Sequence, residues 1–441
     1  MAKVKKIEVS QNSLNQGLMG FIKASPSPFH CVSEIEVNLK EFGFESLDEG
    51  AQWKLSPGGK YYVIRNGSSI VAFSLGKPAS LESGFRMVGA HTDSPCLKVK
   101  PNPDRSYQGF YQAKAEIYGG VLLNPWFDRD LSLAGRVTAL DTKGRVCHLL
   151  VDFERAIATI PSLAIHLDRE QNENRSVQKE KETRPILFQL GEDTEDVRFT
   201  DILRFELEAQ DAKGLGEILD YEMVFYDTQA PAYVGLNKDF IASARLDNQL
   251  SCYVGLQSFL ESSSKVNSLL VCNDHEEVGS QSHIGADGTF LESVLTRIYE
   301  GNSELMYRGM SRSLLISCDN AHGIHPNFPE KHEDTHGPLL NQGPVIKVNS
   351  NQRYATNSET AGIFRYLCQQ EKLPYQVFVV RNDMGCGSTI GPITASRLGV
   401  RTLDVGVPTF GMHSIRELAG ASDSFYLFQA LVSFFQESKA F

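Results

Sequence analysis

Histidine and carboxylate side chains collect in five short polar motifs of this sequence. Four of the motifs directly follow apolar runs: "GAHTDSP" follows "FRMV", "NDHEEVGS" follows "SLLVC", "SCDNAHG" follows "SLLI" and "TFGMHSIRE" follows "LDVGVP". The fifth, "SARLDNQLS", precedes a helical pattern. Ligands of α/β sheets bind beyond the carboxyl ends of the strands, so we expect the motifs to converge there. The converging side chains would be His91, Asp93, Asp247, Glu276, Glu277, Asp319 and His413.

Two imidazoles with several carboxylates are suited to divalent cations, of which zinc is the commonest with such ligands. One zinc ion cannot use so many ligands, whereas two ions about 3.5–4 Å apart that share a carboxylate can. Cobalt or manganese are alternatives. Cations would also offset the repulsion among the crowded ionisable groups of Asp274–Glu277, which follow a buried run.

The spacing within two of the motifs suggests separate tasks for neighbouring side chains. Residues i and i+2 of an extended segment point the same way, so Asp93 can orient the ring of His91. In "HEEVG", Gly279 stands where a second histidine would complete the helical single-zinc motif, which is therefore absent. Glu276 and Glu277 diverge in direction, so one can bind metal while the other acts as general base on water.

Each of these residues also has an ordinary interpretation when it is considered alone. Asp247 could be the N-cap of the following helix, Asp319 a turn residue and His413 an interior histidine. The metal hypothesis therefore depends on their joint placement. Four further histidines crowd the loop after Asp319, where a second metal site is possible but a polar substrate-facing or surface loop is favoured: His322, His325, His332 and His336.

Two other signals narrow the chemistry. The glycine-rich run "NDMGCGSTIG" could present backbone N–H groups to an anion, yet it matches neither the P-loop nor the dinucleotide fingerprint. The sequence contains no GxSxG motif and no cysteine signature of nucleophilic catalysis.

The elements that would position these motifs can be predicted from periodicity and turn residues. Apolar residues of 32–42 have helical spacing, with Gly43 as the stop, and Asn66-Gly67 joins two β-rich runs into a hairpin. Later runs predict strands at 268–272, 313–317, 375–380 and 401–407, and helices at 251–263, 362–372 and 424–438.

The chain has 441 residues, which favours two domains. Strand and helix signals alternate in 1–95 and 239–441, whereas 96–238 shows short β-like runs without helical patterns. We therefore predict an α/β domain that is split in sequence by an inserted, mostly β domain. The polar segment Asp168–Arg184 predicts a solvated loop or mobile flap.

Composition excludes several classes of partner. The net charge is −11 and no basic tract stands out, so nucleic acid and anionic membranes are poor candidates. The eight scattered cysteines favour buried free thiols in a reducing compartment. The N-terminal residues lack the apolar stretch of a signal peptide, and no run is long enough to span a bilayer. We expect a soluble, cytoplasmic protein.

Taken in order along nearly the whole chain, the motifs resemble those of the M18 metallopeptidases, the aspartyl aminopeptidase family. The residues that carry the resemblance are "SPSPFH", "GAHTDSP", "WFDRDLSLAGRV", "SARLDN", "DHEEVGS", "SCDNAHGIHPN", "GPVIKVNSNQRYATN", "NDMGCGSTIGP" and "GMHSIRE". The resemblance implies two zinc ions per subunit. It implies that His91 and Asp319 bind one ion, that Glu277 and His413 bind the other and that Asp247 bridges them. It also implies Glu276 as the general base and Asp93 as the partner of His91.

The resemblance further implies an architecture and an assembly. We expect a three-layer zinc-exopeptidase-like catalytic domain with a mixed sheet, interrupted by a dimerisation domain, and a homo-oligomer in the form of a tetrahedral dodecamer. His166 of the inserted domain matches a histidine that reaches a neighbouring subunit's active site.

The implied activity is hydrolysis of the N-terminal residue from short peptides with a free N-terminus. Family members often prefer N-terminal Asp or Glu, which requires a cationic contact. Lys347 is our first candidate and Arg381 the second, with ordinary surface or ion-pair roles as the alternative. We expect His322 to face the substrate.

Two rival functions remain open at this point. One is another dinuclear zinc hydrolase, such as a deacylase or an aminopeptidase that prefers neutral residues. The other is a non-catalytic assembly or cargo protein that kept the metals for structure, against which the intact Glu276 argues.

Overall fold

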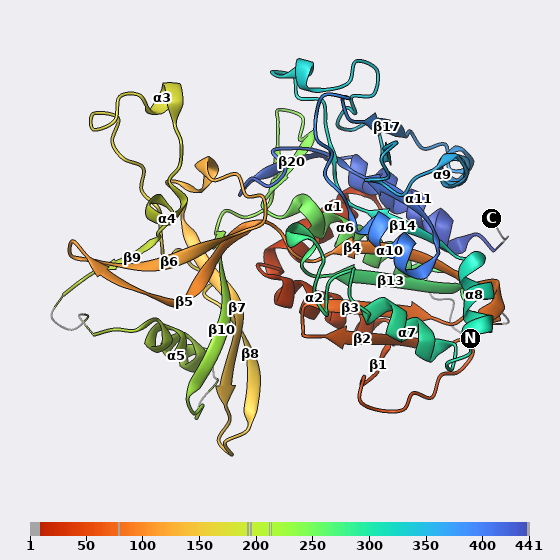
Figure 1. The fold of residues 1–441 in the computed structure, drawn as a ribbon, viewed down its shortest axis with the longest axis horizontal. Coiled ribbons are helices and arrows are strands. Elements are labelled where there is room, and N and C mark those ends of the chain that lie inside the picture. The colour runs from red at the N-terminus through yellow and green to blue at the C-terminus, as the bar shows by residue number, and fades with distance from the viewer. Residues whose placement is uncertain are drawn as a thin grey trace.

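A computed structural model describes residues 9–77, 80–191, 194, 196–210, 212 and 214–438 (Figure 1). The prediction about a signal peptide concerns the N-terminal residues, of which 1–8 lie outside the described residues. Residues 1–8 and 439–441, which form the two ends of the predicted split domain, lie outside them as well. Among the described residues, no helix is long and apolar enough to cross a membrane.

A mixed nine-stranded sheet forms the centre of the larger part of the molecule, in the order β1-β2-β3-β13-β4-β14-β18-β16-β17. The strands β13, β4, β14 and β18 run parallel to one another, whereas β3 and β16 are antiparallel to their inner neighbours. The carboxyl ends of the four parallel strands therefore meet at one edge. The bounds are β1 (Glu45–Ser46), β2 (Lys60–Arg65), β3 (Ser69–Ser74), β4 (Phe85–His91), β13 (Asn267–Asn273), β14 (Leu314–Cys318), β16 (Val345–Val348), β17 (Gln376–Val379) and β18 (Arg401–Gly406).

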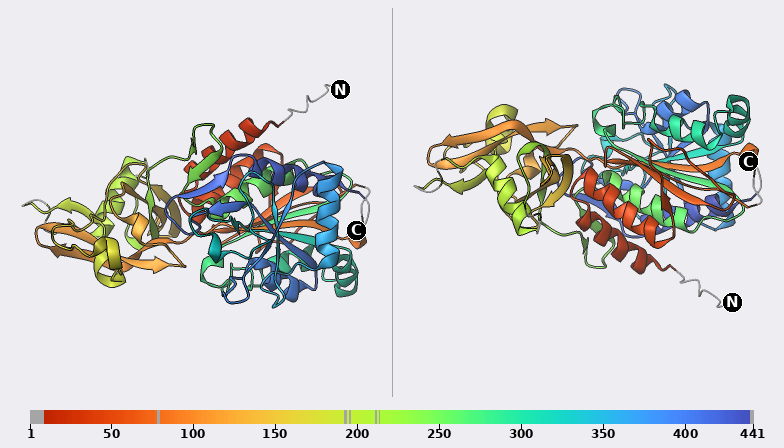
Figure 2. Two further views of the ribbon diagram at one scale, coloured as in Figure 1. Left: turned by 90° about the horizontal axis from the view of Figure 1, so that it is seen from above. Right: turned by 90° about the horizontal axis from the view of Figure 1, so that it is seen from below.

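Helices cover both faces of this sheet (Figure 2). One apolar core joins it to α1, α2, α6, α9 and α11, and a second core joins the other face to α7, α8 and α10. This arrangement confirms the predicted three-layer α/β fold. The bounds are α1 (Gln11–Ala24), α2 (Pro28–Glu41), α6 (Leu246–Leu260), α7 (Phe290–Ile298), α8 (Ser303–Ser311), α9 (Ser358–Gln370), α10 (Ile390–Leu398) and α11 (Asp423–Gln436).

A second, antiparallel sheet of six strands has the order β8-β7-β10-β5-β6-β9 and comes entirely from Cys96–Asp227 (Figure 1). We call this part the inserted β domain. Its own apolar core is separate from the two cores of the central sheet. The exact division at residues 95/96 and 238/239 stays a prediction. The bounds are β5 (Cys96–Tyr107), β6 (Phe110–Tyr118), β7 (Leu131–Leu140), β8 (Val146–Asp152), β9 (Ile186–Gln189) and β10 (Ile218–Asp227).

The prediction that the inserted β domain lacks regular helices is wrong. Helix α5 (Phe199–Ala209) packs three buried residues at helical spacing, Phe199, Leu203 and Leu207, into the core of that domain. The polar segment Asp168–Arg184 contains two single-turn helices, α3 (Gln171–Asn174) and α4 (Lys179–Glu182), and most of its side chains are exposed.

A third sheet of five short strands lies beside the carboxyl edge of the central sheet, in the order β11-β12-β20-β19-β15. All five of its strands come from the part of the chain that follows the inserted β domain. The bounds are β11 (Ala232–Val234), β12 (Phe240–Ser243), β15 (Ala321–His322), β19 (Pro408–Phe410) and β20 (Glu417–Gly420).

The predicted local elements are present. Helix α2 ends at Glu41, with Gly43 at φ +77°, and the hairpin β2–β3 turns through Asn66 and Gly67, both at positive φ. The four later strands correspond to β13, β14, β17 and β18, and the three later helices to α6, α9 and α11. The helices α1, α7, α8 and α10 are additional elements.

Candidate metal centre and active site

The seven predicted site residues converge at the carboxyl edge of the central sheet. His91 is the last residue of β4 and pairs in register with Asn273 of β13, after which the chain turns through Glu276 and Glu277. Asp319 directly follows β14, and its backbone N–H donates to Val405 of β18. Three overlapping groups of these side chains could each hold a metal ion: His91 with Asp247 and Asp319, Asp247 with Glu277 and His413, and His91 with Glu276 and Glu277.

Asp247 lies between the two histidines. Its Oδ1 is 3.5 Å from His91 Nε2, and its Oδ2 is 3.5 Å from His413 Nε2. The Asp247 side chain faces these histidines, and no backbone N–H of α6 donates to it among the described residues, so Asp247 does not act as the N-cap of that helix. Oδ1 of Asp247 is buried without a hydrogen-bond partner among the described residues. One carboxylate is thus shared between two candidate metal positions.

The remaining distances complete two ligand groups. His91 Nε2 lies 3.7 Å from Asp319 Oδ1, and His413 Nε2 lies 3.3 Å from Glu277 Oε2. Oε1 of Glu277 is also buried without a partner among the described residues. Buried carboxylate oxygens that lack a donor are costly unless a bound group satisfies them.

The electrostatics follow from this crowding. Burial opposes a charged His91, yet the carboxylates of Asp247, Asp319 and Asp93 raise the pKa of His91 well above its ordinary value. Burial and the nearby charge of Asp247 raise the pKa of Glu277 well above its ordinary value. Burial also acts against an ionised Asp247, but the two histidines outweigh it and lower the pKa of Asp247. The site is thus short of positive charge.

Asp93 orients one of the histidines, as its spacing predicts. His91 Nδ1 donates to the backbone carbonyl of Asp93 at 3.0 Å and lies 3.3 Å from Asp93 Oδ1. This leaves Nε2 of His91 directed at the carboxylates. The Asp93 carboxylate also accepts the backbone N–H groups of Glu276 and Glu277, at 3.2 and 3.1 Å, and so holds the turn that carries both glutamates.

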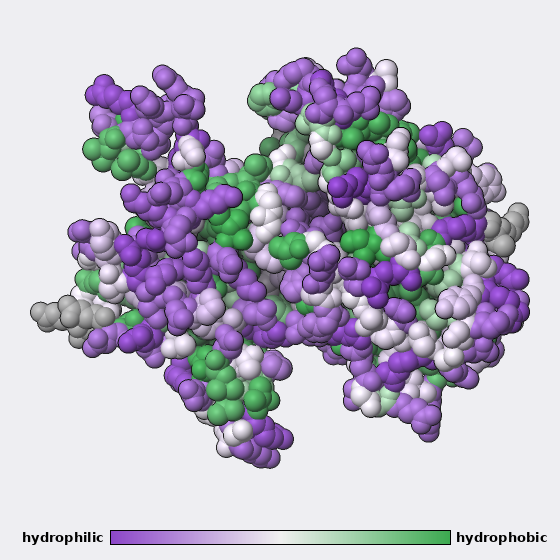
Figure 3. All heavy atoms as spheres, viewed as in Figure 1, coloured by the Kyte–Doolittle hydropathy of each residue, from purple (hydrophilic) through white to green (hydrophobic). Residues whose placement is uncertain are grey.

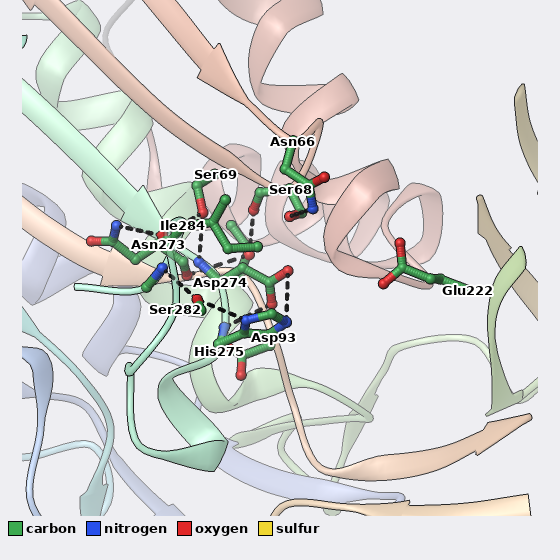
Figure 4. A network of polar contacts seen from close by, with 12 residues as sticks. Asn66, Ser68, Ser69, Asp93, Glu222, Asn273, Asp274, His275, Ser282 and Ile284 are labelled. Carbon is green, nitrogen blue, oxygen red and sulfur yellow. Dashed lines mark hydrogen bonds and ion pairs between the residues drawn. The ribbon is translucent and has the colours of Figure 1, made fainter. Parts of the chain in front are cut away.

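A second polar network anchors the same turn (Figure 4). The backbone N–H of Asp274 donates to Ser69 Oγ, the Asp274 carboxylate accepts the N–H of His275, and the His275 ring bonds Ser282 Oγ at 2.9 Å. Burial, with the charge of Asp93, raises the pKa of Asp274 to about 7. Burial and the neighbouring carboxylates raise the pKa of Glu276 to about 8. The electrostatic repulsion expected among the ionisable side chains of Asp274–Glu277 is therefore present in the folded protein.

Glu417 is a buried residue of the site that the sequence analysis missed. It lies on β20 with 2 % of its surface exposed, and it accepts the backbone N–H of Asp247 at 2.9 Å and that of His413 at 3.0 Å. One carboxylate therefore ties together two ligand segments that are far apart in sequence. Its position four residues after His413, within "GMHSIRE", was the available signal.

The inserted β domain also reaches the site. The Tyr118 hydroxyl donates to Asp93 Oδ2 at 2.7 Å, and His413 Nδ1 donates to the carbonyl of Gly120 at 3.1 Å. No sequence signal pointed to Tyr118 or Gly120.

A cavity of about 350 Å³ opens over the metal-ligand groups. Besides the ligands, Glu276, His322 and Lys347 line it. Lys347 is 2 % exposed; its Nζ donates to the carbonyl of Asn320 at 2.8 Å and to Asp319 Oδ2 at 3.2 Å. The cavity thus combines a candidate base, a candidate metal pair and one buried cation.

Some predicted residues lie away from this cavity. Arg381 lines a neighbouring cavity of about 300 Å³, which shares His322 with the first, and it pairs with Asp383. His166 is exposed on the inserted β domain, and it does not line either cavity. Within the described chain, no candidate metal group includes the histidines that follow Asp319, so a second metal site there has no support.

The donor set suits zinc. Two imidazole nitrogens and several carboxylates are borderline-to-hard ligands, and the buried oxygens of Asp247 and Glu277 without partners are positions that a cation would satisfy. A carboxylate shared between two groups, beside a separate glutamate with raised pKa, is an arrangement suited to metal-assisted hydrolysis.

Comparison with known proteins gives a consistent result. Residues 21–435 match the family model described as aminopeptidase I zinc metalloprotease (M18). The chain is 57% identical over 425 residues to a probable M18 family aminopeptidase 2 of Pseudomonas fluorescens, covering 96% of this chain and 98% of that protein.

Solved structures with the same fold support the match. The chain resembles one in the cryo-EM structure of the Ape4 and Nbr1 complex, with a TM-score of 0.94, 39% identity, and coverage of 97% of this chain and 86% of that chain. It also resembles the mApe1 dodecamer of S. cerevisiae, with a TM-score of 0.83, 27% identity, and coverage of 96% of each chain.

Proposed function

The chain belongs to the M18 family of zinc aminopeptidases, and from this premise we propose that it removes the N-terminal residue of short peptides at a site for two zinc ions. The observation that carries the two-ion proposal is the position of Asp247, whose two oxygens each lie 3.5 Å from a different histidine. The sharing of one carboxylate between two ions is typical of dinuclear hydrolases.

The proposed ligand roles follow the two groups. His91 and Asp319 hold one ion, Glu277 and His413 hold the other, and Asp247 bridges them. Zinc is the proposed metal, with cobalt or manganese as possible substitutes.

The proposed mechanism assigns the proton transfers to Glu276. Bound zinc supplies Lewis acidity, which polarises the scissile carbonyl and makes water more acidic. Glu276, whose side chain lines the cavity, takes a proton from the attacking water and delivers it to the leaving amine. The carboxylates around the site provide contacts for the positively charged α-amino group of the substrate, which would restrict the enzyme to N-terminal residues.

We further propose a preference for N-terminal Asp or Glu. Lys347 is the cation on the wall of the main cavity, and its ammonium group has three donors. Two of them bond Asn320 and Asp319, which leaves one for a substrate carboxylate. His322 lines the same cavity and would contact the substrate, whereas Arg381 is the weaker candidate because it lies in the neighbouring cavity and pairs with Asp383.

A homo-oligomeric assembly is also part of the proposal. The similar mApe1 of S. cerevisiae is described as a dodecamer. The exposed large apolar side chains of the inserted β domain include Val146, Leu150, Leu163, Ile165 and Leu167. Figure 3 shows apolar patches on the surface of this domain. We propose a tetrahedral dodecamer in which this domain forms dimer contacts and His166 reaches a neighbouring active site. The eight free cysteines support a cytoplasmic location.

A substrate panel tests the proposed reaction. Aspartyl, glutamyl, alanyl and leucyl anilides would be compared with the N-acetyl derivatives of the same four free amino acids under identical zinc loading. The proposal predicts hydrolysis of the free-amine substrates, fastest for the acidic residues. Hydrolysis of N-acyl amino acids in place of anilides would instead identify a deacylase, and equal rates for acidic and neutral residues would remove the acidic preference.

A further inference from the structure

The segment Tyr118–Leu122 of the inserted β domain begins at the last residue of β6 and contacts His413 and Asp93, the partner of His91. Three hydrogen bonds connect it to the site. The Tyr118 hydroxyl donates to Asp93 Oδ2 at 2.7 Å, Gly120 accepts the ring N–H of His413 at 3.1 Å, and Leu122 N–H donates to the carbonyl of His413 at 3.0 Å.

The Tyr118 contact acts on His91 through Asp93. Asp93 holds Nδ1 of His91, and its carboxylate also accepts the N–H groups of Glu276 and Glu277. The phenol hydroxyl is the one side-chain donor on this carboxylate, besides His91, among the described residues. Removal of the phenol hydroxyl would leave Oδ2 of Asp93 with the Glu277 N–H but without its side-chain donor, and would so weaken the hold of this carboxylate on His91.

The two glycines of the segment pack directly against the other ligand pair. A Cβ on Gly119 would lie 3.1 Å from Glu277 Cβ and 3.3 Å from the Glu277 carbonyl oxygen, and Gly119 has φ +70°. A Cβ on Gly120 would lie 3.1 Å from His413 Nδ1. A Cβ at either position would push the ligand or the segment away by a few tenths of an ångström, so glycine suits this close approach of the backbone to both ligands.

We propose that the inserted β domain positions the metal ligands through Tyr118–Leu122, so that it contributes to metal affinity within its own chain in addition to any part in assembly. Tyr118 is a positioning residue that acts on His91 through Asp93. Gly119 and Gly120 fix the positions of Glu277 and His413 by packing against them. Partners that orient metal ligands typically contribute 10–100-fold to metal affinity or activity. This inference rests on the proposed zinc centre.

The first test compares two tyrosines of the same strand. Tyr118→Phe removes the hydroxyl that bonds Asp93, and Tyr111→Phe removes a similar hydroxyl that donates to Asp104 Oδ1 at 2.6 Å inside the inserted β domain, away from the metal site. Zinc affinity of each full-length apoprotein would be measured by competition with a chromophoric chelator, together with its Tm. We expect zinc binding to weaken about 10–100-fold in Tyr118→Phe, and to stay at the wild-type value in Tyr111→Phe, whose effect would fall on Tm.

The second test compares two glycines with similar backbone angles. Gly119→Ala and Gly109→Ala impose the same kind of positive-φ strain, since Gly109 has φ +79°, but nothing lies within 4 Å of a Cβ on Gly109. We expect Gly119→Ala to weaken zinc binding and Gly109→Ala to leave it unchanged.

The outcomes separate this inference from the function on which it rests. Wild-type protein that binds no zinc would overturn the proposed centre and the inference together. Wild-type protein that binds zinc, with Tyr118→Phe and Gly119→Ala binding it equally tightly, would overturn the inference alone.

Discussion

The backbone N–H of Asp247 donates to Glu417 Oε2 at 2.9 Å, so the backbone of the residue whose carboxylate lies between the two histidines is held by a second, buried carboxylate. The other oxygen of Glu417 accepts the N–H of His413 at 3.0 Å. Glu417 thereby fixes the backbone of Asp247 relative to that of His413.

Glu417→Gln is expected to weaken zinc binding. An amide has only one acceptor oxygen, and its NH₂ would face a backbone donor, so one of the two ligand segments would be released. We expect a loss of about 10–100-fold in zinc affinity, measured by chelator competition on the apoprotein.

Asp423→Asn is the matched control for Glu417→Gln. Asp423 is also buried and also accepts two backbone N–H groups, but these come from Asn341 and Gly343, which belong to no candidate metal group among the described residues. It should lower Tm and leave zinc affinity unchanged. Equal zinc affinities in both variants and wild type would show that Glu417 has a structural role only.

Glu276→Gln is expected to abolish most activity while zinc stays bound. The amide keeps the shape of the side chain but cannot take a proton, and general-base catalysis typically contributes about 10²–10⁴-fold. The measurements are kcat on an aspartyl anilide and zinc content. The neighbouring Glu277→Gln is the contrast, since loss of a ligand should lower zinc content as well. Wild-type kcat in Glu276→Gln would refute the proposed base.

Lys347→Ala tests the acidic preference. A hydrogen bond to a charged group is worth about 1.5–3 kcal/mol, so kcat/KM for acidic N-terminal residues should fall by about tenfold or more relative to neutral ones. The ratio is the readout, because loss of the ion pair with Asp319 will slow every substrate to some extent. Arg381→Ala should leave the ratio unchanged. Equal losses on acidic and neutral substrates would remove Lys347 from the specificity role.

His30 gives the fold a specific sensitivity to acid. Burial, with the nearby Arg245 cation, lowers the pKa of His30 to about 4, from an ordinary value of 6.5. The unfolded chain therefore binds a proton that the folded chain does not, and stability is lost as pH falls from 6.5 towards 4. The full loss from this group is about 3 kcal/mol.

His30→Gln should remove this part of the acid sensitivity. Gln can keep a hydrogen bond to Ser27 Oγ, which His30 Nδ1 contacts at 2.8 Å. We expect the Tm of wild type to fall more steeply than that of His30→Gln between pH 6.5 and 4.5, with both proteins metal-free. Parallel curves over that range would contradict the assignment.

Much of the candidate centre could be predicted because its ligands stand at strand ends. The strands β13, β4 and β14 have apolar runs that stop at a polar residue, so Glu277, His91 and Asp319 could be assigned to one edge of one sheet. The two-residue spacing of His91 and Asp93 predicted their contact, which is a local property of extended backbone.

The contacts that could not be predicted depend on tertiary placement. Glu417 and Tyr118 bond to segments that are remote in sequence, and nothing in their own neighbours specifies those partners. The pairing of Lys347 with Asp319 follows from how close β16 and the end of β14 lie across β18, a distance that only the folded sheet sets. Helix α5 differs from the expectation although Phe199, Leu203 and Leu207 repeat at helical spacing, because the expectation for the whole of 96–238 rested on its short β-like runs.

Zinc content tests the central claim most directly. Protein purified without chelator, loaded with zinc and freed of excess metal should contain two zinc ions per chain by elemental analysis. Asp247→Asn should lower that number, because in the proposed centre both ions would share the carboxylate that lies 3.5 Å from each histidine. One ion per chain, or none after loading, would contradict the two-ion centre.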